Sequence, residues 1–180
     1  MKYLVLDIET TGLDPLECEI TCIGILKLWN GKTNCFLNEG LKDSEEKILK
    51  DFWKEISQES PDYLVGWNLD NFDWRFLKIR SLIRRVKMTK YYRKRDRIDL
   101  MHVLRTPKWR SLESFAGALS IPGKMPLDPL VLFETKDFEE LKKYNLQDLK
   151  VTAEIFKRCL KYGIVNPEDE NKQIEETGEN

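Results

Sequence analysis

Histidine and paired cysteines are scarce in this chain of 180 residues. The only histidine is His102, and the four cysteines include no C-x-x-C pair, so the usual ligands of a structural zinc site are missing. If Cys18 and Cys22 both lie in one strand, they would be about 13 Å apart at about 3.3 Å per residue, which is too far for a disulfide. We therefore expect reduced, partly buried thiols and no zinc.

Long apolar segments are absent as well. No stretch approaches the ~18 uninterrupted apolar residues of a membrane-spanning helix. The N-terminus leads directly into a strand-like run, without the charged and apolar regions of a secretory signal. With 41% hydrophobic residues, the chain can bury the core of one compact domain. We expect a cytoplasmic protein that does not associate with membranes.

The acidic charge is concentrated at the C-terminus. Residues 166–180 contain six acidic residues and one lysine, a net of 1 − 6 = −5, in a chain whose total formal charge is −1. Low hydrophobicity and charge of one sign predict a disordered acidic tail over 166–180. The folded domain is therefore expected to occupy residues 1–165.

The segment from 78 to 97 has the opposite charge. It contains ten basic residues and one acidic residue, a net of 10 − 1 = +9, and Tyr91 and Tyr92 are interleaved with them. Basic side chains beside aromatic rings are typical of surfaces that bind single-stranded nucleic acid, and we expect Arg93, Lys94 and Arg95 to contact such a strand. The alternative is an ordinary solvated helix face.

Three short acidic patterns follow one another along the chain. Asp7-Ile8-Glu9-Thr10 ends the first strand, residues 68–73 follow a later strand, and residues 144–148 lie in the last helix. Asp7 and Glu9, at positions i and i+2, project to the same side of a strand, and Tyr144 lies one helical turn before Asp148. Carboxylates from three distant segments indicate a site for a hard cation, Mg²⁺ or Mn²⁺, rather than zinc.

The last helix, expected over 137–162, supplies an independent argument. Its apolar stripe includes Leu141, Leu149 and Ile155, and Asp148 faces inward with the stripe, with no Lys or Arg near it on that face. A buried carboxylate is costly unless it finds a cation or takes up a proton, so a metal ion is its simplest partner. Taken alone, Asp7 and Glu9 could form a strand-end turn, and Asp73 could be a helix N-terminal charge.

Together, the three patterns resemble the Exo I, Exo II and Exo III motifs of the DEDD 3′→5′ exonucleases, in the DEDDy subgroup. The segment 66–73 looks most like the second motif of the proofreading domains of family B DNA polymerases, and Ser111 to Ala116 is similar to the segment before their last helix. Three motifs in order are a far more specific signal than one. The resemblance implies a ribonuclease H-like exonuclease, which would stand alone because the chain is too short to include a polymerase domain.

The resemblance also implies roles for the acidic residues and for Tyr144. Two Mg²⁺ or Mn²⁺ ions would lower the pKa of an attacking water and stabilise the leaving 3′ oxygen, and Tyr144 would orient that water. In the sister DEDDh subgroup a histidine lies five positions before the last aspartate, where this chain has Lys143, so His102 is expected to be structural. The ions would be held by Asp7, Glu9 and Asp148, with Asp7 bridging to a second ion that Asp73 supports through water.

The implied substrate is a single-stranded 3′ end, with DNA favoured over RNA and DNA repair as the expected setting. The resemblance implies that Phe72 and Leu13 pack against the terminal base or sugar and that Asn68 contacts the terminal nucleotide or positions Asp73. Thr10 belongs to the same expected site. A core role for Phe72 is an equal alternative, because it begins a helical apolar series. Two other functions stay open: the same chemistry on RNA ends, and a non-catalytic nucleic-acid-binding or polymerase-accessory protein.

The expected architecture is α/β, with a mixed five-stranded sheet and helices on both faces, like the ribonuclease H fold. Prolines punctuate residues 120–136, which we expect to form a loop that acts as a mobile flap near the active site. The expected strands are 2–8, 20–29, 33–38, 63–66 and 97–99, and the expected helices are 44–57, 70–86, 100–105, 111–119 and 137–162.

Overall fold

The computed structural model of the chain describes residues 1–123 and 125–166. The acidic tail expected over 166–180 falls, apart from Asn166, outside the described residues, and the domain boundary at 165 stays a prediction. None of the helices in the described ranges is long and apolar enough to cross a membrane.

Five strands form one mixed sheet with the order β3-β2-β1-β4-β5. β1 pairs antiparallel with β2, and β2 antiparallel with β3, whereas β1 pairs parallel with β4, and β4 parallel with β5. The expected mixed five-stranded sheet is therefore confirmed. The strands are β1 Tyr3–Thr10, β2 Ile20–Lys27, β3 Thr33–Leu37, β4 Tyr63–Gly66 and β5 Arg97–Asp99.

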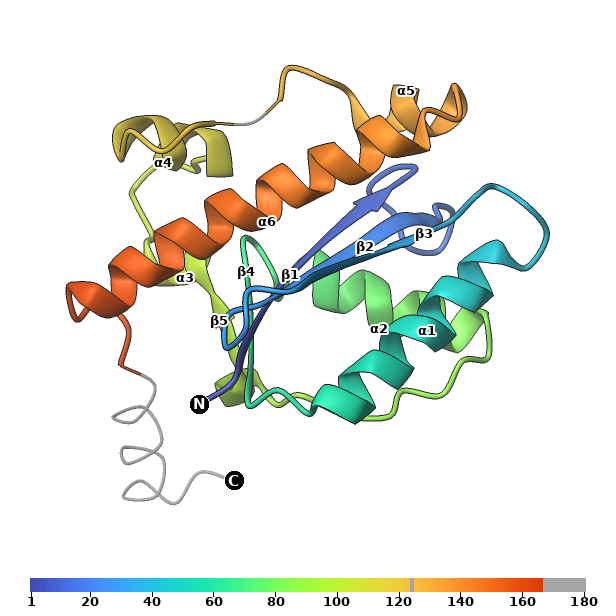
Figure 1. Ribbon diagram of the computed structural model, residues 1–180, viewed down its shortest axis with the longest axis horizontal. Coiled ribbons are helices and arrows are strands. Elements are labelled where there is room, and N and C mark those ends of the chain that lie inside the picture. Colours follow the sequence, from blue (N-terminus) through green and yellow to red (C-terminus); the bar gives the residue numbers. More distant parts are fainter. Residues whose placement is uncertain (124, 167–180) are drawn as a thin grey trace.

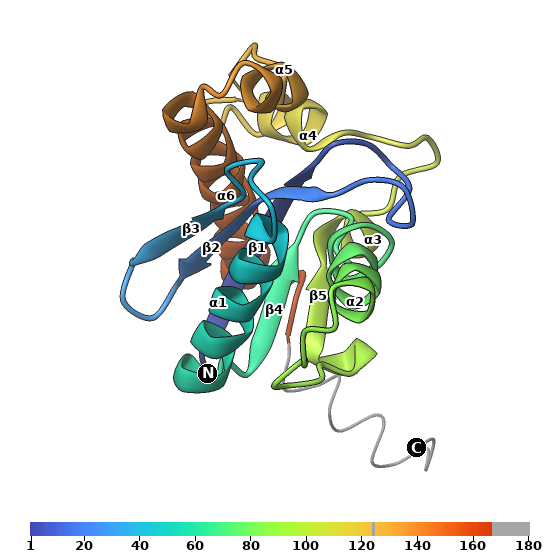
Figure 2. The same ribbon diagram turned by 90° about the vertical axis from the view of Figure 1, so that its right-hand side faces the viewer.

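Helices cover both faces of this sheet, as expected. α6 runs along one face, while α1 and α2 lie against the other (Figure 1). α4 and α5 lie on the same side as α6 (Figure 2). The helices are α1 Ser44–Glu59, α2 Asp73–Ile83, α3 Leu100–Val103, α4 Leu112–Ala118, α5 Pro129–Glu134 and α6 Phe138–Lys161, and a short 3₁₀ helix, η1 Lys94–Asp96, precedes β5.

The two faces of β1 have different roles. Leu4, Leu6 and Ile8 are buried in the core that α1 and α2 complete, and Val5 is buried in the core that α6 completes. Because side chains alternate along a strand, the positions that follow Val5 at intervals of two also face α6. The sheet thus presents Asp7 and Glu9 to the last helix, beyond the end of the apolar run.

The structure differs from the sequence expectation in the segment 120–136. Residues 129–134 form the helix α5 rather than a loop, and Leu132 is buried. Asp128 caps this helix, since its side chain accepts a hydrogen bond of 2.9 Å from the backbone N–H of Leu130, and Pro129 occupies the first turn, where its missing N–H costs nothing. Prolines predict a loop here, but Pro129 starts a helix.

α2 also begins later than expected, at Asp73 rather than near residue 70. Asn68 adopts the left-handed conformation, with φ of 58°, so the chain turns sharply after β4 before the helix can start. Phe72 therefore precedes the helix, but its half-buried ring packs against Phe76 and the core, as the core alternative predicts. This turn places Asp73 in the first helical turn, close to the end of β1.

Candidate metal centre

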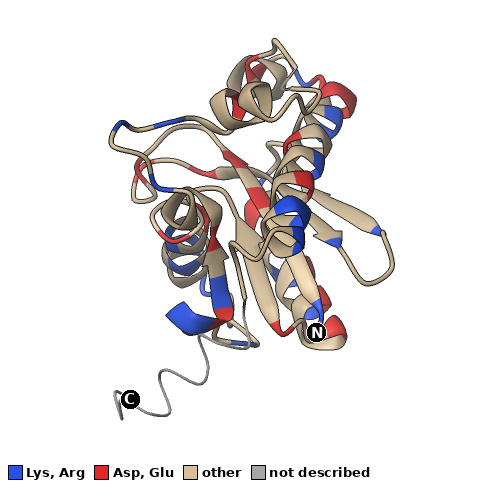
Figure 3. Cartoon of the chain, turned by 90° about the vertical axis from the view of Figure 1, so that its left-hand side faces the viewer, with Lys and Arg blue, Asp and Glu red and all other residues tan. Residues whose placement is uncertain are grey.

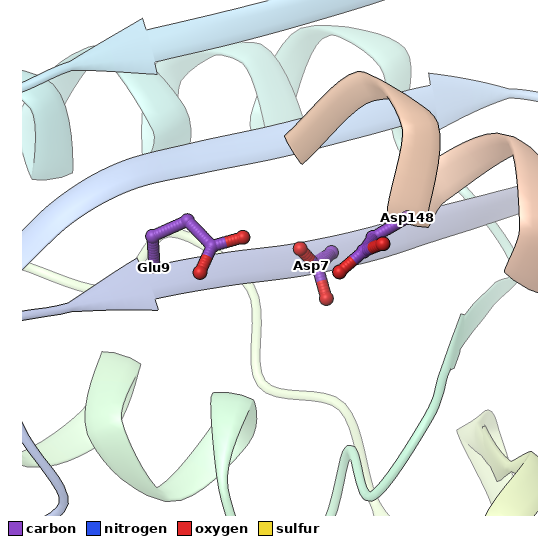
Figure 4. Close-up of side chains that lie close together, drawn as sticks. All are labelled: Asp7, Glu9 and Asp148. Atoms are coloured by element: carbon purple, nitrogen blue, oxygen red, sulfur yellow. The ribbon is translucent and has the colours of Figure 1, made fainter. Parts of the chain in front are cut away.

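Three carboxylates converge between β1 and α6. Asp7, Glu9 and Asp148 each contribute one oxygen atom, and these atoms all lie within 4.8 Å of one another. Figure 4 shows the side chains of Asp7 and Glu9 rising from β1 toward Asp148, which comes from the helix above them. An all-oxygen, negatively charged donor set of this kind suits a hard divalent cation. The residues present therefore fit the expected Mg²⁺ or Mn²⁺.

Local structure explains why these three meet. Asp7 and Glu9 project from the same side of β1, and α6 packs across β1 and β2 on that side. The inward face of α6 carries Leu141, Leu149 and Ile155, as expected, and Asp148 is buried among them. The pattern of the last helix thus correctly predicted which carboxylate would face the sheet.

Asn145 fixes the carboxylate of Asp7. The side-chain amide of Asn145 donates a hydrogen bond of 2.7 Å to Asp7 Oδ2 and one of 3.3 Å to the Asp7 carbonyl oxygen. Asn145 is completely buried, and a Cβ atom at Gly24, which lies opposite Asp7 on β2, would be 1.7 Å from Asn145 Oδ1. Glycine at position 24 therefore makes room for the amide that orients Asp7.

Sequence reasoning missed Asn145, although two signals were present. Asn145 lies three residues before Asp148, a spacing that places both on one side of a helix. Gly24 interrupts an apolar strand, which often marks a close approach of another segment. Neither signal identifies the partner, because that depends on where α6 crosses the sheet.

Tyr144 is buried one helical turn before Asp148. It packs with Cys22, Leu132 and Leu141 in a small apolar cluster between β2, α5 and α6. Tyr144 and Asp148 are therefore both buried on α6, and the expected contact between them stays a prediction. The role of Tyr144 in catalysis also stays a prediction.

Asp73 lies close to this centre but does not belong to the group of three. It is buried, and its Oδ1 accepts a hydrogen bond of 3.0 Å from the backbone N–H of Ile8, between the two β1 carboxylates. Burial, and then the negative charge of Asp7, raise the pKa of Asp73 well above its usual value, against the effect of the Ile8 N–H. Its support of a second ion stays a prediction.

Cys22 and Cys35 flank the centre on β2 and β3. Cys22 lies opposite Glu9, and its Sγ is 2.8 Å from Sγ of Cys35. Burial, and then the Cys35 thiol and the charges of Glu9 and Asp7, raise the pKa of Cys22 well above its usual value. All four cysteines are free, as expected, but Cys18 precedes β2, so the pair considered from the sequence was not the pair in contact.

Of the four residues expected at the terminal nucleotide, Thr10 ends β1 and Leu13 lies in the turn after it, whereas Asn68 and Phe72 lie in the turn after β4. The carboxyl ends of these paired parallel strands meet at one edge of the sheet. Thr10 Oγ1 donates to the carbonyl oxygen of Gly12 at 2.6 Å, and Leu13 is 84% exposed. Asn68 and Phe72 are half-buried. Their contacts with substrate stay predictions.

The basic residues expected to bind the strand lie elsewhere. Arg93 is exposed just before η1, where its Nε is 3.1 Å from Asp96 Oδ2, and Arg95 Nε is 3.8 Å from Asp96 Oδ1. Tyr92 is fully buried and packs against Trp74, so the expectation that Tyr92 offers a stacking surface is wrong. Substrate binding by residues 93–95 stays a prediction.

Comparison with known proteins identifies the family. A model of the RNase_H superfamily matches residues 4–125, which is more than half of the chain. The chain belongs to the RNase_H superfamily. The matched range includes Asp7, Glu9 and Asp73, and α6 with Asp148 follows it.

Several relatives of this RNase_H superfamily member are archaeal. An uncharacterised protein of Methanocaldococcus jannaschii is 39% identical over 104 residues, a match that covers 58% of this chain and 55% of that protein. A DNA polymerase of Archaeoglobus fulgidus is 36% identical over 85 residues, which covers 45% of this chain and 10% of the polymerase. The chain thus matches about half of the first relative and a small part of the second.

A solved structure has the same fold. The family B DNA polymerase of the archaeon Pyrobaculum calidifontis matches with a TM-score of 0.76 at 19% identity, over 91% of this chain and 25% of the polymerase. The expected ribonuclease H-like fold and the resemblance to family B DNA polymerases are therefore confirmed.

Proposed function

We propose that this RNase_H superfamily member is a metal-dependent 3′→5′ exonuclease that releases nucleotides from DNA 3′ ends. The observation that carries the proposal is the convergence of Asp7, Glu9 and Asp148 within 4.8 Å at the end of β1. Such a site would have little structural purpose on its own, because like charges held together cost stability unless a cation joins them.

Different residues of the chain would bind the ions, position the water and orient the ligands. Asp7, Glu9 and Asp148 would hold the divalent ions. Such ions would lower the pKa of the attacking water and stabilise the negative charge on the leaving oxygen. Tyr144 would position the water, and Asn145 keeps the Asp7 carboxylate in one orientation through its 2.7 Å hydrogen bond. Asp73, buried beside them, would support a second ion through water.

The proposed substrate is a single-stranded DNA 3′ end. DNA is favoured because the polymerase relatives are DNA polymerases and because the acidic motifs resemble those of their proofreading domains. No 2′-hydroxyl-reading residue is evident in the described part of the chain, so RNA ends serve as the matched comparison in the test.

The test uses the purified chain with Mg²⁺ or Mn²⁺ and matched end-labelled DNA and RNA oligonucleotides. We expect 5′-labelled DNA to give a ladder that shortens from the 3′ end and excess chelator to stop the reaction. Asp7→Ala should abolish turnover, whereas Asp51→Ala, which removes an exposed carboxylate of α1, should not change it.

Several results would overturn the proposal. Activity that persists in excess chelator would exclude the metal assignment. Equal cutting of closed circular DNA would exclude an exonuclease, and faster degradation of RNA would make the chain an exoribonuclease. A chain that binds oligonucleotides without degrading either polymer, with both ions tested, would be a non-catalytic binding protein.

A further inference from the structure

The loop between α3 and α4, residues 104–111, carries a second basic and aromatic cluster. Arg105, Lys108 and Arg110 are exposed in this loop, and the Trp109 side chain is 73% exposed. The sequence from 100 to 112 contains no acidic residue. Figure 2 shows this segment, coloured yellow-green, extending away from the sheet. Figure 3 shows its Lys and Arg positions in blue.

These three positively charged side chains have no ion-pair partner among the described residues. Within residues 1–123 and 125–166, none of Arg105, Lys108 and Arg110 forms an ion pair or donates a side-chain hydrogen bond. An exposed indole with three unpaired cations around it combines the two elements of a single-strand binding surface, namely phosphate neutralisation and base stacking.

The loop also borders a hollow in the surface. A cavity of about 320 Å³ is lined by Arg105, Lys108, Trp109 and Arg110 of the loop, and Asn71 and Asp99 also line it. Asn71 lies in the turn after β4, two residues before Asp73, and its side chain donates a hydrogen bond of 3.3 Å to Asn68 Oδ1. The cavity therefore connects the basic loop with the segment that leads to the metal centre.

Strand register places the loop at the correct end of the sheet. Arg97 of β5 aligns with Leu64 of β4, and Leu64 aligns with Leu4 of β1, three residues before Asp7. At about 3.3 Å per residue, β5 begins about 10 Å below the level of Asp7 along the strands. The chain leaves β5 toward that level, so α3 and the loop follow at the metal-site end, whereas η1 precedes β5 at the opposite end.

We propose that the loop 104–111 binds the single strand that enters the metal centre, with Arg105, Lys108 and Arg110 contacting phosphates and Trp109 stacking on a base. The inference rests on the proposed exonuclease function only for the direction in which the strand runs. It assigns the main strand contact to this loop and not to residues 93–95.

The test compares two variants that each remove three positive charges. One carries Arg105→Ala, Lys108→Ala and Arg110→Ala, and the control carries Arg93→Ala, Lys94→Ala and Arg95→Ala. Binding of a fluorescent single-stranded DNA of about 12 nucleotides is measured by anisotropy in chelator at several salt concentrations. At about 0.7 log units per phosphate contact, the slope of log affinity against log salt should fall by about 2 in the loop variant and stay at the parent value in the control.

Trp109 provides a second, independent readout. Trp109→Ala should weaken binding about 5- to 150-fold without changing the salt slope, because stacking involves no counterion release. Trp109→Phe keeps an aromatic face and should restore most of the affinity. Because Trp109 is exposed, neither change should unfold the protein. An unchanged affinity in Trp109→Ala, or a changed salt slope in the control triple variant only, would overturn the inference.

A mononucleotide ester separates this inference from the proposed function. The p-nitrophenyl ester of thymidine 5′-phosphate can occupy the metal centre but offers no strand to the loop, so the parent and both triple variants should hydrolyse it equally in Mn²⁺. If all three hydrolyse the ester and the loop variant binds the strand like the parent, the loop inference fails and the function stands. If none hydrolyses the ester while the loop variant loses strand binding, the loop inference stands and the nuclease function fails.

Discussion

Residues 78–97 carry a larger positive charge than the loop 104–111, but the fold neutralises much of that charge. Arg80 and Arg84 pair with Glu45, and Arg97 pairs with Asp70. In the described structure, the loop 104–111 contributes no ion pair. The comparison teaches that net charge along a sequence does not locate a binding surface, because the positions of the acidic partners in the fold decide which cations stay available.

The ion pairs of Glu45 show how basic residues of the segment 78–97 stabilise the fold. Glu45 is buried at the start of α1, and Arg80 Nη2 of α2 lies 2.6 Å from its Oε2. Glu45 Oε1 also accepts a hydrogen bond of 2.8 Å from the backbone N–H of Ile20. One carboxylate therefore joins α1, α2 and the first residue of β2, on the face of the sheet opposite α6.

Outside the three carboxylates, the largest expected effect separates chemistry from strand binding. Tyr144→Phe removes only the hydroxyl group proposed to orient the attacking water, so single-turnover rates at saturating DNA should fall about 10²- to 10⁴-fold. Affinity in chelator and the salt slope should stay at the parent values, since neither basic region is touched. Tyr91→Phe, which alters an exposed tyrosine, is the control. Parent activity in Tyr144→Phe would make Tyr144 a packing residue.

The second prediction concerns the segment 78–97, whose positive charge is partly neutralised by ion pairs. Arg80→Ala should lower the free energy of unfolding by about 3–5 kcal/mol, because it removes a buried partner of Glu45. Lys78→Ala, on the exposed side of the same helix, should change it by less than about 0.5 kcal/mol. Denaturant titration measures both. If Arg80→Ala is no more destabilising than Lys78→Ala, the conclusion that the fold uses the positive charge of residues 78–97 for its own stability is contradicted.

A third prediction concerns the residue that orients Asp7. Asn145→Ala should reduce turnover and Mn²⁺ affinity about 10- to 100-fold, as expected when a group that holds a metal ligand is lost. Lys150→Ala on the exposed side of α6 is the control. Strand binding in chelator should be unaffected in both variants. Equal Mn²⁺ affinity in Asn145→Ala and Lys150→Ala would show that Asp7 needs no such support.

The smallest expected effect is on acid stability. Burial raises the pKa of Glu45, but hydrogen bonds from Arg80, from the Ile20 N–H and from Arg84 outweigh it, so the net shift is downward. Its stabilisation is therefore complete above the unfolded-state pKa of about 4.3 and is lost as the pH falls through the lower folded-state value. The stability difference between the parent and Glu45→Gln should shrink below about pH 4. A difference that is constant down to pH 2 would contradict this role.

Much of the fold could be predicted because each local pattern agrees with the tertiary structure. The i, i+2 spacing of Asp7 and Glu9 predicted that they share one side of β1, and the helical stripe of α6 predicted its inward face. α5 could not be predicted, because a helix of six residues has too few turns for a periodic pattern and its prolines also fit a loop.

The candidate site was predictable only where periodicity determines it. Asp7, Glu9 and Asp148 follow from spacing within a strand and a helix. The contacts of Asn145, Tyr92 and Cys22 depend on which segments meet in space, which no local pattern specifies. The same limit explains the charge distribution, since the pairing of Arg80 with Glu45 joins residues 35 positions apart.

Metal binding tests the central claim most directly, because it needs neither a substrate nor turnover. Mn²⁺ is titrated into the parent, Asp7→Asn, Asp148→Asn and Asp51→Asn, with free Mn²⁺ followed by electron paramagnetic resonance. The parent and Asp51→Asn should bind Mn²⁺ alike, and the two cluster variants should bind it at least ~10-fold more weakly, because each has lost a carboxylate of the group of three. Equal Mn²⁺ affinity in all four proteins would contradict the assignment of Asp7, Glu9 and Asp148 as a metal centre.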